Sequence, residues 1–144
     1  MNRCGECYAC CELPEIKEIN KPANKKCFNY NDACSGCGIY NDRPEVCRNY
    51  KCLWLSQEQI PDYYRPDKCG MVFEMPSGTL FYIGVEYKEG AHKQPIIFNL
   101  INKIVDAGHS VIVSTQKEGL KYKLAQGDNL ADIQKKYNEI YMKA

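Results

Sequence analysis

Residues 4–11 read CGECYACC, so four cysteines occupy eight consecutive positions. The bias extends over the N-terminal half of the chain, because all ten cysteines lie within the first 69 of the 144 residues. This half is also rich in Asn and Pro and poor in apolar runs, as in CFNYNDACSGCGIYNDRP at 27–44. Such a sequence cannot build a core from its own side chains, so we expect a cross-link to order residues 1–69.

The kind of cross-link depends on the redox compartment. The opening residues MNRCGECYACCELPE contain no apolar run typical of a signal peptide, and no stretch approaches a membrane-spanning length. We therefore expect the reducing cytoplasm, where structural disulfides are rare and clustered cysteines indicate metal. A disulfide scaffold and unligated thiols stay as minor alternatives. The net charge of +1 gives no electrostatic reason to expect binding to nucleic acid or to a membrane.

The spacing of the cysteines is typical of metal knuckles. C-x2-C suits a tight turn that aims two sulfurs at one ion, and small residues such as Gly ease the bend. Both histidines, His92 and His109, lie in the other half of the chain, so we expect an all-thiolate site. The candidate metal ligands are Cys4, Cys7, Cys10, Cys11, Cys27, Cys34, Cys37, Cys47 and Cys52.

All-sulfur sites leave two choices of metal. The number of cysteines suits one or two tetrathiolate zinc sites, which is the interpretation we favour slightly. The three-in-a-loop arrangement of Cys4, Cys7 and Cys10 is instead typical of a [4Fe–4S] cluster. However, the ferredoxin-type closing cysteine followed by Pro is missing from that loop. The sequence leaves both metals open, and it does not assign each sulfur to a site.

A second motif, CGIYNDRPEVCRNYKC at 37–52, follows the first. Together with CGECYACC it resembles the CxxCxxCC cysteine-cluster family (YkgJ-type), described as zinc- or iron-chelating proteins. The likeness covers about residues 4–54 and includes Cys27, whereas Cys34 and Cys69 lie outside the shared pattern. Some larger proteins similar in this module act on flagellin as lysine methylases. This chain lacks a Gly-rich nucleotide loop after a strand, so the resemblance implies chelation and not that reaction.

Two arginines of the second motif, Arg43 and Arg48, are candidates for stabilising the metal centre. A tetrathiolate zinc site and a four-cysteine [4Fe–4S] cluster each carry a formal charge of roughly −2. Charge-assisted N–H···S bonds from the two guanidinium groups would offset it. A solvent-exposed position is the competing interpretation for both residues. We also predict a short helix over 44–52 that holds Cys47 and Cys52.

The C-terminal half, residues 70–144, predicts a conventional small fold. Residues 71–87 read as two apolar runs around Pro-Ser-Gly, and residues 109–126 read as two runs around Lys-Glu-Gly. Two amphipathic helices are predicted, one over 95–108 and one starting at 128 or 129. The order is ββ-α-ββ-α. We therefore predict an α+β protein in which an irregular, metal-stapled half, residues 1–69, packs on this half as one compact unit.

Three functions fit these features. The first is a binding or adaptor module that metal folds and that presents a surface to a protein partner. The second is an iron–sulfur redox or sensing protein. The third, least favoured, is a metal-dependent enzyme in which Cys34 or Cys69 is reactive. No side chain in the sequence stands out as a catalytic base, so we name no catalytic residue, and we expect His92 to lie on a surface loop.

Overall fold

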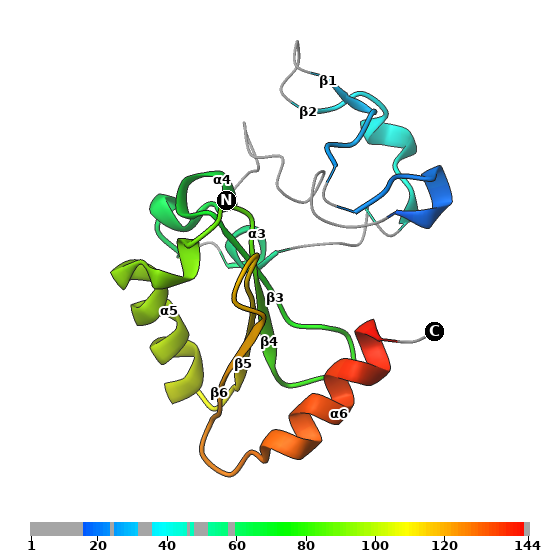
Figure 1. Ribbon diagram of the computed structural model, residues 1–144. Coiled ribbons are helices and arrows are strands. Elements are labelled where there is room, and N and C mark those ends of the chain that lie inside the picture. Colours follow the sequence, from blue (N-terminus) through cyan, green and yellow to red (C-terminus); the bar gives the residue numbers. More distant parts are fainter. Residues whose placement is uncertain are drawn as a thin grey trace. The chain divides into compact units, whose positions relative to one another are not determined.

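The structure, a computed structural model, describes residues 16–23, 25–31, 36–45, 47, 52–57 and 60–142 (Figure 1). The chain divides into two compact units, Met1–Val72 and Phe73–Ala144, with the boundary inside strand β3. The presence of helices beside a mixed sheet confirms the α+β class in its general form.

The described part of the N-terminal unit consists of short elements. They are η1 (Lys17–Ile19), β1 (Tyr30–Asn31), β2 (Gly36–Cys37), η2 (Tyr40–Asp42), α3 (Leu53–Ser56), η3 (Asp62–Tyr64) and α4 (Pro66–Cys69). Helix α4 shows why they are short. Pro66 starts it at a position where no N–H is needed, and Gly70 ends it in the left-handed region at φ 78°.

The C-terminal unit contains most of the sheet and both long helices. Its elements are β3 (Met71–Glu74, shared with the first unit), β4 (Tyr82–Glu86), η4 (Ala91–Lys93), α5 (Pro95–Asp106), β5 (Val111–Ser114), β6 (Leu120–Lys123) and α6 (Leu130–Tyr141). The predicted order of two strands, a helix, two strands and a helix is confirmed.

The sheet has the strand order β3-β4-β5-β6, so consecutive strands are neighbours. Strands β4 and β5 are parallel, with Tyr82 opposite Val111, and α5 forms the crossover between them. Strands β5 and β6 form an antiparallel hairpin, as predicted, with Ser114 opposite Leu120. Residues 75–81 connect β3 to β4, which is too short for a parallel crossover. The sheet is therefore mixed.

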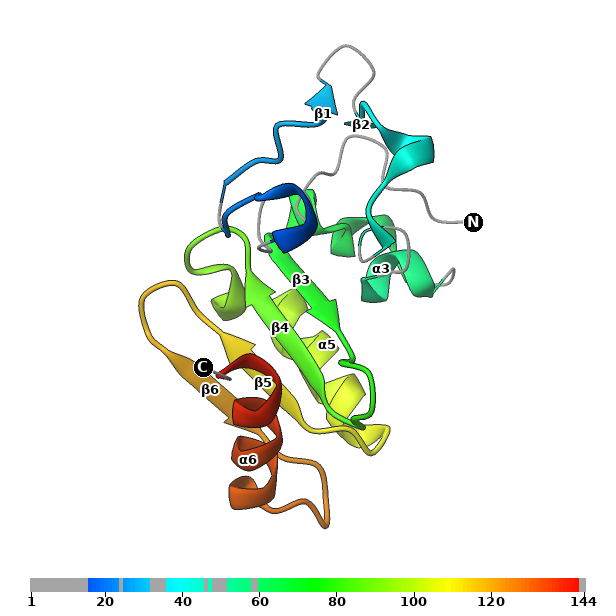
Figure 2. The ribbon, with the colours of Figure 1, turned by 90° about the vertical axis from the view of Figure 1, so that its right-hand side faces the viewer.

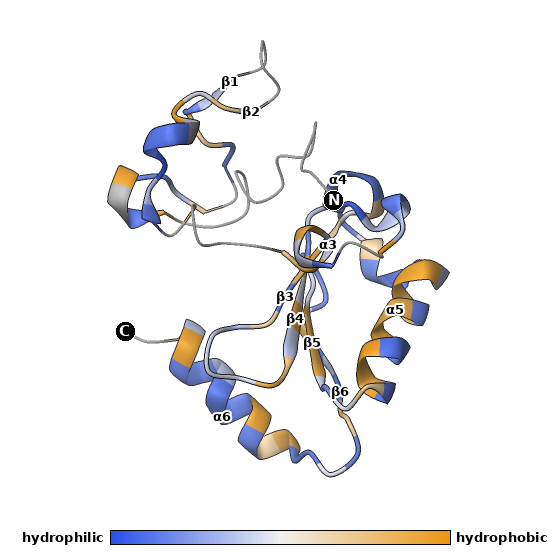
Figure 3. Cartoon of the chain, turned by 180° about the vertical axis from the view of Figure 1, so that it is seen from behind, coloured by the Kyte–Doolittle hydropathy of each residue, from blue (hydrophilic) through white to orange (hydrophobic). Residues whose placement is uncertain are grey.

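Helices cover both faces of this sheet. Figure 2 shows α6 in front of the strands and α5 behind them. Side chains alternate along each strand, so Phe81, Ile83 and Ile112 form a cluster on one face, against Ile133 and Tyr137 of α6. The opposite face is covered by α5, whose buried side chains are Ile97, Leu100, Ile101 and Ile104. Figure 3 shows the consequence, since hydrophobic residues dominate α5 and β5 but alternate with hydrophilic ones along α6.

The sequence left two candidates for the N-cap residue of helix α6, Asp128 and Asn129. Asn129 is the cap, because its side-chain oxygen accepts from the N–H of Ala131 at 2.8 Å. Asp128 instead accepts a hydrogen bond of 2.5 Å from the buried hydroxyl of Ser110. That hydroxyl also accepts from the N–H of Ala125. The Ser110–Asp128 contact thus anchors the connection that leads into α6.

The predicted apolar stripe of α6 is only partly buried. Ile133 and Tyr137 pack against the core cluster, but Leu130, Ile140 and Tyr141 stay 39–42 % exposed. The reason is geometric, since a straight helix cannot follow a twisted sheet along its whole length. The hydroxyl of Tyr141 reaches Glu74 of β3, to which it donates a hydrogen bond of 3.2 Å.

Candidate functional site

Cys37 lies in a small two-stranded ribbon of the N-terminal unit, and Cys27 lies at the turn that leads into this ribbon. The backbone turns at Cys27, whose carbonyl accepts from the N–H of Tyr30 at 3.0 Å. Tyr30 then pairs directly with Cys37 in the antiparallel β1–β2 ribbon. The N–H of Asn29 points at the Sγ of Cys27 across 3.4 Å. A backbone N–H aimed at sulfur stabilises a thiolate, as it does in metal knuckles.

Cys47 and Cys52 belong to different local structures, which corrects the predicted helix over 44–52. Cys47 is helical, and its N–H donates to the carbonyl of Pro44 at 3.0 Å. Cys52 is extended, with ψ 166°, and is the N-cap residue of α3. Cys47 and Cys52 therefore do not share one helix. As the N-cap residue of α3, Cys52 accepts with its carbonyl the first backbone hydrogen bond of that helix, from the N–H of Ser56.

Cys69 is a core residue. It closes α4, is 2 % exposed, and its Sγ lies 3.4 Å from each of the carbonyl oxygens of Tyr64 and Met71. Burial raises the pKa of the Cys69 thiol, and the charges of Asp67 and Cys52 raise it further. A neutral thiol that donates to backbone carbonyls is a poor metal ligand.

The other predicted site residues, Cys4, Cys7, Cys10, Cys11, Cys34 and Arg48, lie outside the described residues. Arg43 is described; it follows η2 with extended backbone and is half-buried. Each of the five described cysteines carries a thiol rather than a disulfide. Within the described ranges, no three Cys, His, Asp or Glu side chains come together as a metal site. The donor chemistry at Cys27 and Cys37 fits a thiolate centre, whereas a complete ligand set is not among the described residues.

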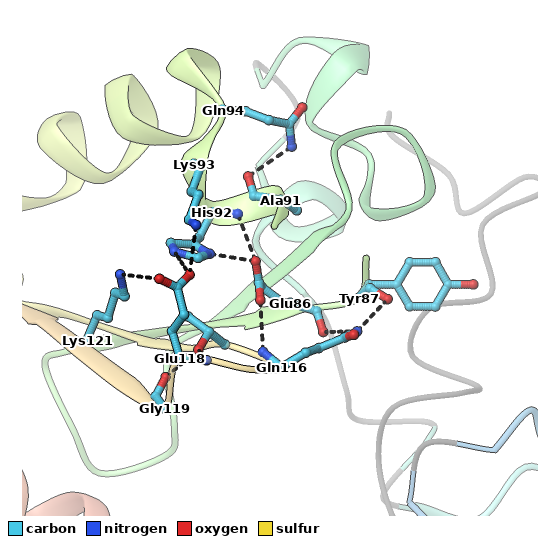
Figure 4. Close-up of polar contacts among 11 residues, drawn as sticks. Glu86, Tyr87, Ala91, His92, Lys93, Gln94, Gln116, Glu118, Gly119 and Lys121 are labelled. Atoms are coloured by element: carbon cyan, nitrogen blue, oxygen red, sulfur yellow. Dashed lines mark hydrogen bonds and ion pairs between the residues drawn. The ribbon is translucent and has the colours of Figure 1, made fainter. Parts of the chain in front are cut away.

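A second polar cluster lies in the C-terminal unit, around His92 of η4 (Figure 4). Glu86, the last residue of β4, places its Oε2 2.6 Å from the Nδ1 of His92 and also accepts from the backbone N–H of His92. Its Oε1 accepts from the N–H of Gln116 at 2.8 Å. The Nε2 of His92 lies 3.2 Å from an oxygen of Glu118, in the turn between β5 and β6. Three elements therefore meet at one imidazole.

This cluster was not predicted from the sequence. The expectation that His92 lies on a surface loop is wrong, because its side chain is only 8 % exposed and that of Glu86 only 1 %. The physical reason is that a buried carboxylate needs donors, and the backbone of η4 supplies one beside the imidazole. His109, by contrast, lies beside the sheet, where its Nδ1 contacts the carbonyl of Leu80 and its ring packs edge-on against Tyr82.

Both carboxylates of the cluster are ionised at neutral pH. Burial raises the pKa of Glu86, but the hydrogen bonds from His92 and from the N–H of Gln116 outweigh it, so the pKa lies below its usual range. A hydrogen bond from Lys93, together with the charge of Lys121, lowers the pKa of Glu118. The arrangement can hold and orient one imidazole between two negative charges.

Comparison with protein-family models, with curated proteins and with solved structures finds no match to this chain. No helix within the described ranges has the length and apolar character needed to cross a bilayer.

Proposed function

We propose that the N-terminal unit is a thiolate metal-binding module that metal folds, and that the chain acts as a binding or adaptor protein. The observation that carries the proposal is the Cys27–Cys37 ribbon. Cys37 lies in strand β2, opposite Tyr30, and Cys27 lies at the turn that leads into β1. Both side chains are thiols, and the N–H of Asn29 points at the sulfur of Cys27. The resemblance of residues 4–54 to the cysteine-cluster family supports the same chemistry.

The two units differ in what can stabilise them. The C-terminal unit has an apolar cluster and long helices, which are sufficient for a small fold. The described elements of the N-terminal unit are two to four residues long. Such short elements form few hydrogen bonds of their own. A structural zinc supplies on the order of 10 kcal/mol of folding free energy, which is enough to order them. Metal dependence is therefore expected in the N-terminal unit alone.

Removal of metal from the full chain under anaerobic, reducing conditions tests the proposal. Amide NMR signals of the N-terminal unit, such as those of Asn29 and Gly38, should collapse to random-coil positions. Signals of the C-terminal unit, such as those of Ile83 and Ile112, should keep their dispersion. Retention of the dispersed N-terminal signals after complete removal of metal would contradict the proposal.

Two cysteine variants provide matched tests of the ligand set. Cys27→Ser should reduce the bound metal, because it removes a sulfur that the backbone is arranged to support. Cys69→Ala should leave the metal content unchanged, although it perturbs a buried position. Equal metal content in Cys27→Ser and the parent chain would exclude Cys27 as a ligand.

The identity of the metal is part of the same experiment. We propose thiolate-bound zinc, in one or two sites, with a [4Fe–4S] cluster as the alternative that the spacing of Cys4, Cys7 and Cys10 favours. An anaerobic preparation that is brown and absorbs broadly in the visible would indicate the cluster and a redox or sensing function. A colourless preparation that contains zinc and no iron would support the adaptor function.

We further propose that the partner is a protein. Lys and Arg number 19 and Asp and Glu number 18. This near balance gives no long-range attraction toward nucleic acid or an anionic membrane. Retention of the metal-loaded chain by duplex DNA or by phosphatidylserine vesicles at physiological salt would contradict this choice.

A further inference from the structure

The imidazole of His92 has two nitrogens in unequal surroundings. Nδ1 lies 2.6 Å from Glu86, a distance typical of a strong charge-assisted hydrogen bond. Nε2 is buried and makes no hydrogen bond of good geometry, although a carboxylate oxygen of Glu118 lies only 3.2 Å away. Because this buried ring nitrogen lies beside an anion without a hydrogen bond, its protonation would change the interaction between Nε2 and Glu118.

The protonation of each nitrogen follows from its neighbour. An ionised carboxylate only accepts hydrogen bonds, so the Nδ1 of His92 must carry the hydrogen toward Glu86. In the neutral ring, Nε2 then presents a lone pair to the Glu118 carboxylate, which is repulsive. In the charged ring, Nε2 carries a hydrogen and the same contact becomes an attractive ion pair.

We propose that His92 is a proton-operated latch for the β5–β6 turn, residues 115–119. With both nitrogens protonated, the imidazolium bridges Glu86 of β4 and Glu118 of the turn and holds the turn against η4. When Nε2 loses its proton, the bridge to Glu118 is lost and the turn is held less tightly. The proton moves between Nε2 and solvent, so no other group has to change its charge.

The charged groups around His92 come from β4, η4, the β5–β6 turn and β6. Glu86 lies on β4 and Glu118 on the turn, while Lys93 of η4 and Lys121 of β6 contact the Glu118 carboxylate at 3.2 and 3.5 Å. These ammonium groups disfavour a bound metal cation at Glu118. Lys93 is 65 % exposed, so its ion pair with Glu118 contributes little on its own.

A pH titration of the full chain, followed by NMR over a range that covers both charge states of the His92 ring, tests the latch. The neutral ring of His92 should carry its hydrogen on Nδ1. As His92 loses the second proton, the hydrogen-exchange protection factor of the Gln116 amide should fall about two- to fivefold, the range of one exposed ion pair. Glu118→Gln should abolish this change. Glu89→Gln, which removes a carboxylate paired with Lys117 and not with His92, should preserve it.

Three results would overturn the latch. They are a neutral ring with its hydrogen on Nε2, a Gln116 protection factor that does not change as His92 titrates, and the same change in Glu118→Gln as in the parent chain. Glu118 is 40 % exposed, so its substitution should leave the fold intact. The first two readouts use the unmodified chain and need no variant.

Discussion

Removal of the Glu86 carboxylate should destabilise the C-terminal unit more than any single surface change. This side chain accepts from the N–H of His92 at 3.1 Å, from the N–H of Gln116 at 2.8 Å and from the ring of His92 at 2.6 Å. It therefore connects β4 to η4 and to the turn after β5. Glu86→Ala removes the acceptor for all three donors at once.

The expected loss of stability follows from the number of hydrogen-bond donors that Glu86→Ala leaves without an acceptor. Each buried donor left without an acceptor costs about 1–3 kcal/mol, and entry of water into the space of the lost side chain reduces the sum. We expect Glu86→Ala to lower the free energy of unfolding by about 3–6 kcal/mol, a large part of the typical 5–15 kcal/mol. Glu86→Gln keeps one carbonyl acceptor but turns an NH₂ group toward a donor, so about 1.5–3 kcal/mol should be lost.

The loss of stability in the Glu86 variants should depend on pH, because the pKa of Glu86 in the folded chain lies below the ordinary value of 4.5. The stabilisation that goes with this shift is fully present above pH 4.5 and disappears as the pH falls through the lower, folded value. The difference between Glu86→Gln and the parent chain should therefore shrink in acid.

Urea unfolding followed by circular dichroism, at neutral pH and at several acidic values, measures both effects. Glu89→Ala is the control, since Glu89 is 56 % exposed and pairs only with an exposed lysine, so it should change stability by less than about 0.5 kcal/mol. A loss below about 1 kcal/mol for Glu86→Ala would refute the reasoning, because it would mean that the three donors find water or other acceptors without cost.

Three further substitutions test separate parts of the structure. Ile112→Ala, at a fully buried position between the helices, should cost about 2–5 kcal/mol by urea unfolding, whereas Leu80→Ala, at 77 % exposure, should cost less than about 0.5 kcal/mol. Asn129→Ala should cost about 1 kcal/mol, and Asn129→Asp should restore most of it, because the N–H groups of α6 need only a side-chain oxygen. In the folded chain, Cys69 should react with iodoacetamide far more slowly than in the chain unfolded in urea, because burial raises the pKa of its thiol. Mass spectrometry of the alkylated peptide measures the two rates, and equal rates would contradict the burial of Cys69.

The elements of the C-terminal unit could be predicted because each is encoded locally. Helix α5 combines Pro95 at its first turn with apolar residues on one face, and residue 108 is a glycine at φ 98°. Turn residues mark the strands in the same way. The partners of the strands were harder to predict, since the parallel pairing of β4 with β5 depends on where α5 packs and not on either strand alone. The competition between Asp128 and Asn129 was likewise decided by Ser110, eighteen residues before Asp128.

The cysteine cluster could be predicted from the sequence, whereas the cluster around His92 could not, for a physical reason. Metal ligands repeat one residue type at short spacing, because several sulfurs must reach one ion from one loop, so the cysteines stand out without any structure. The cluster at His92 uses one residue from each of three elements, and Glu86, His92 and Glu118 are ordinary residues in a charged segment. What distinguishes Glu86 from the exposed Glu89 is burial at the end of β4, which depends on the pairing of β4 with β5. Burial and backbone contacts likewise separate Cys27 from Cys69, although both are cysteines. A backbone N–H aimed at sulfur favours a thiolate at Cys27, whereas carbonyls around sulfur favour a thiol at Cys69.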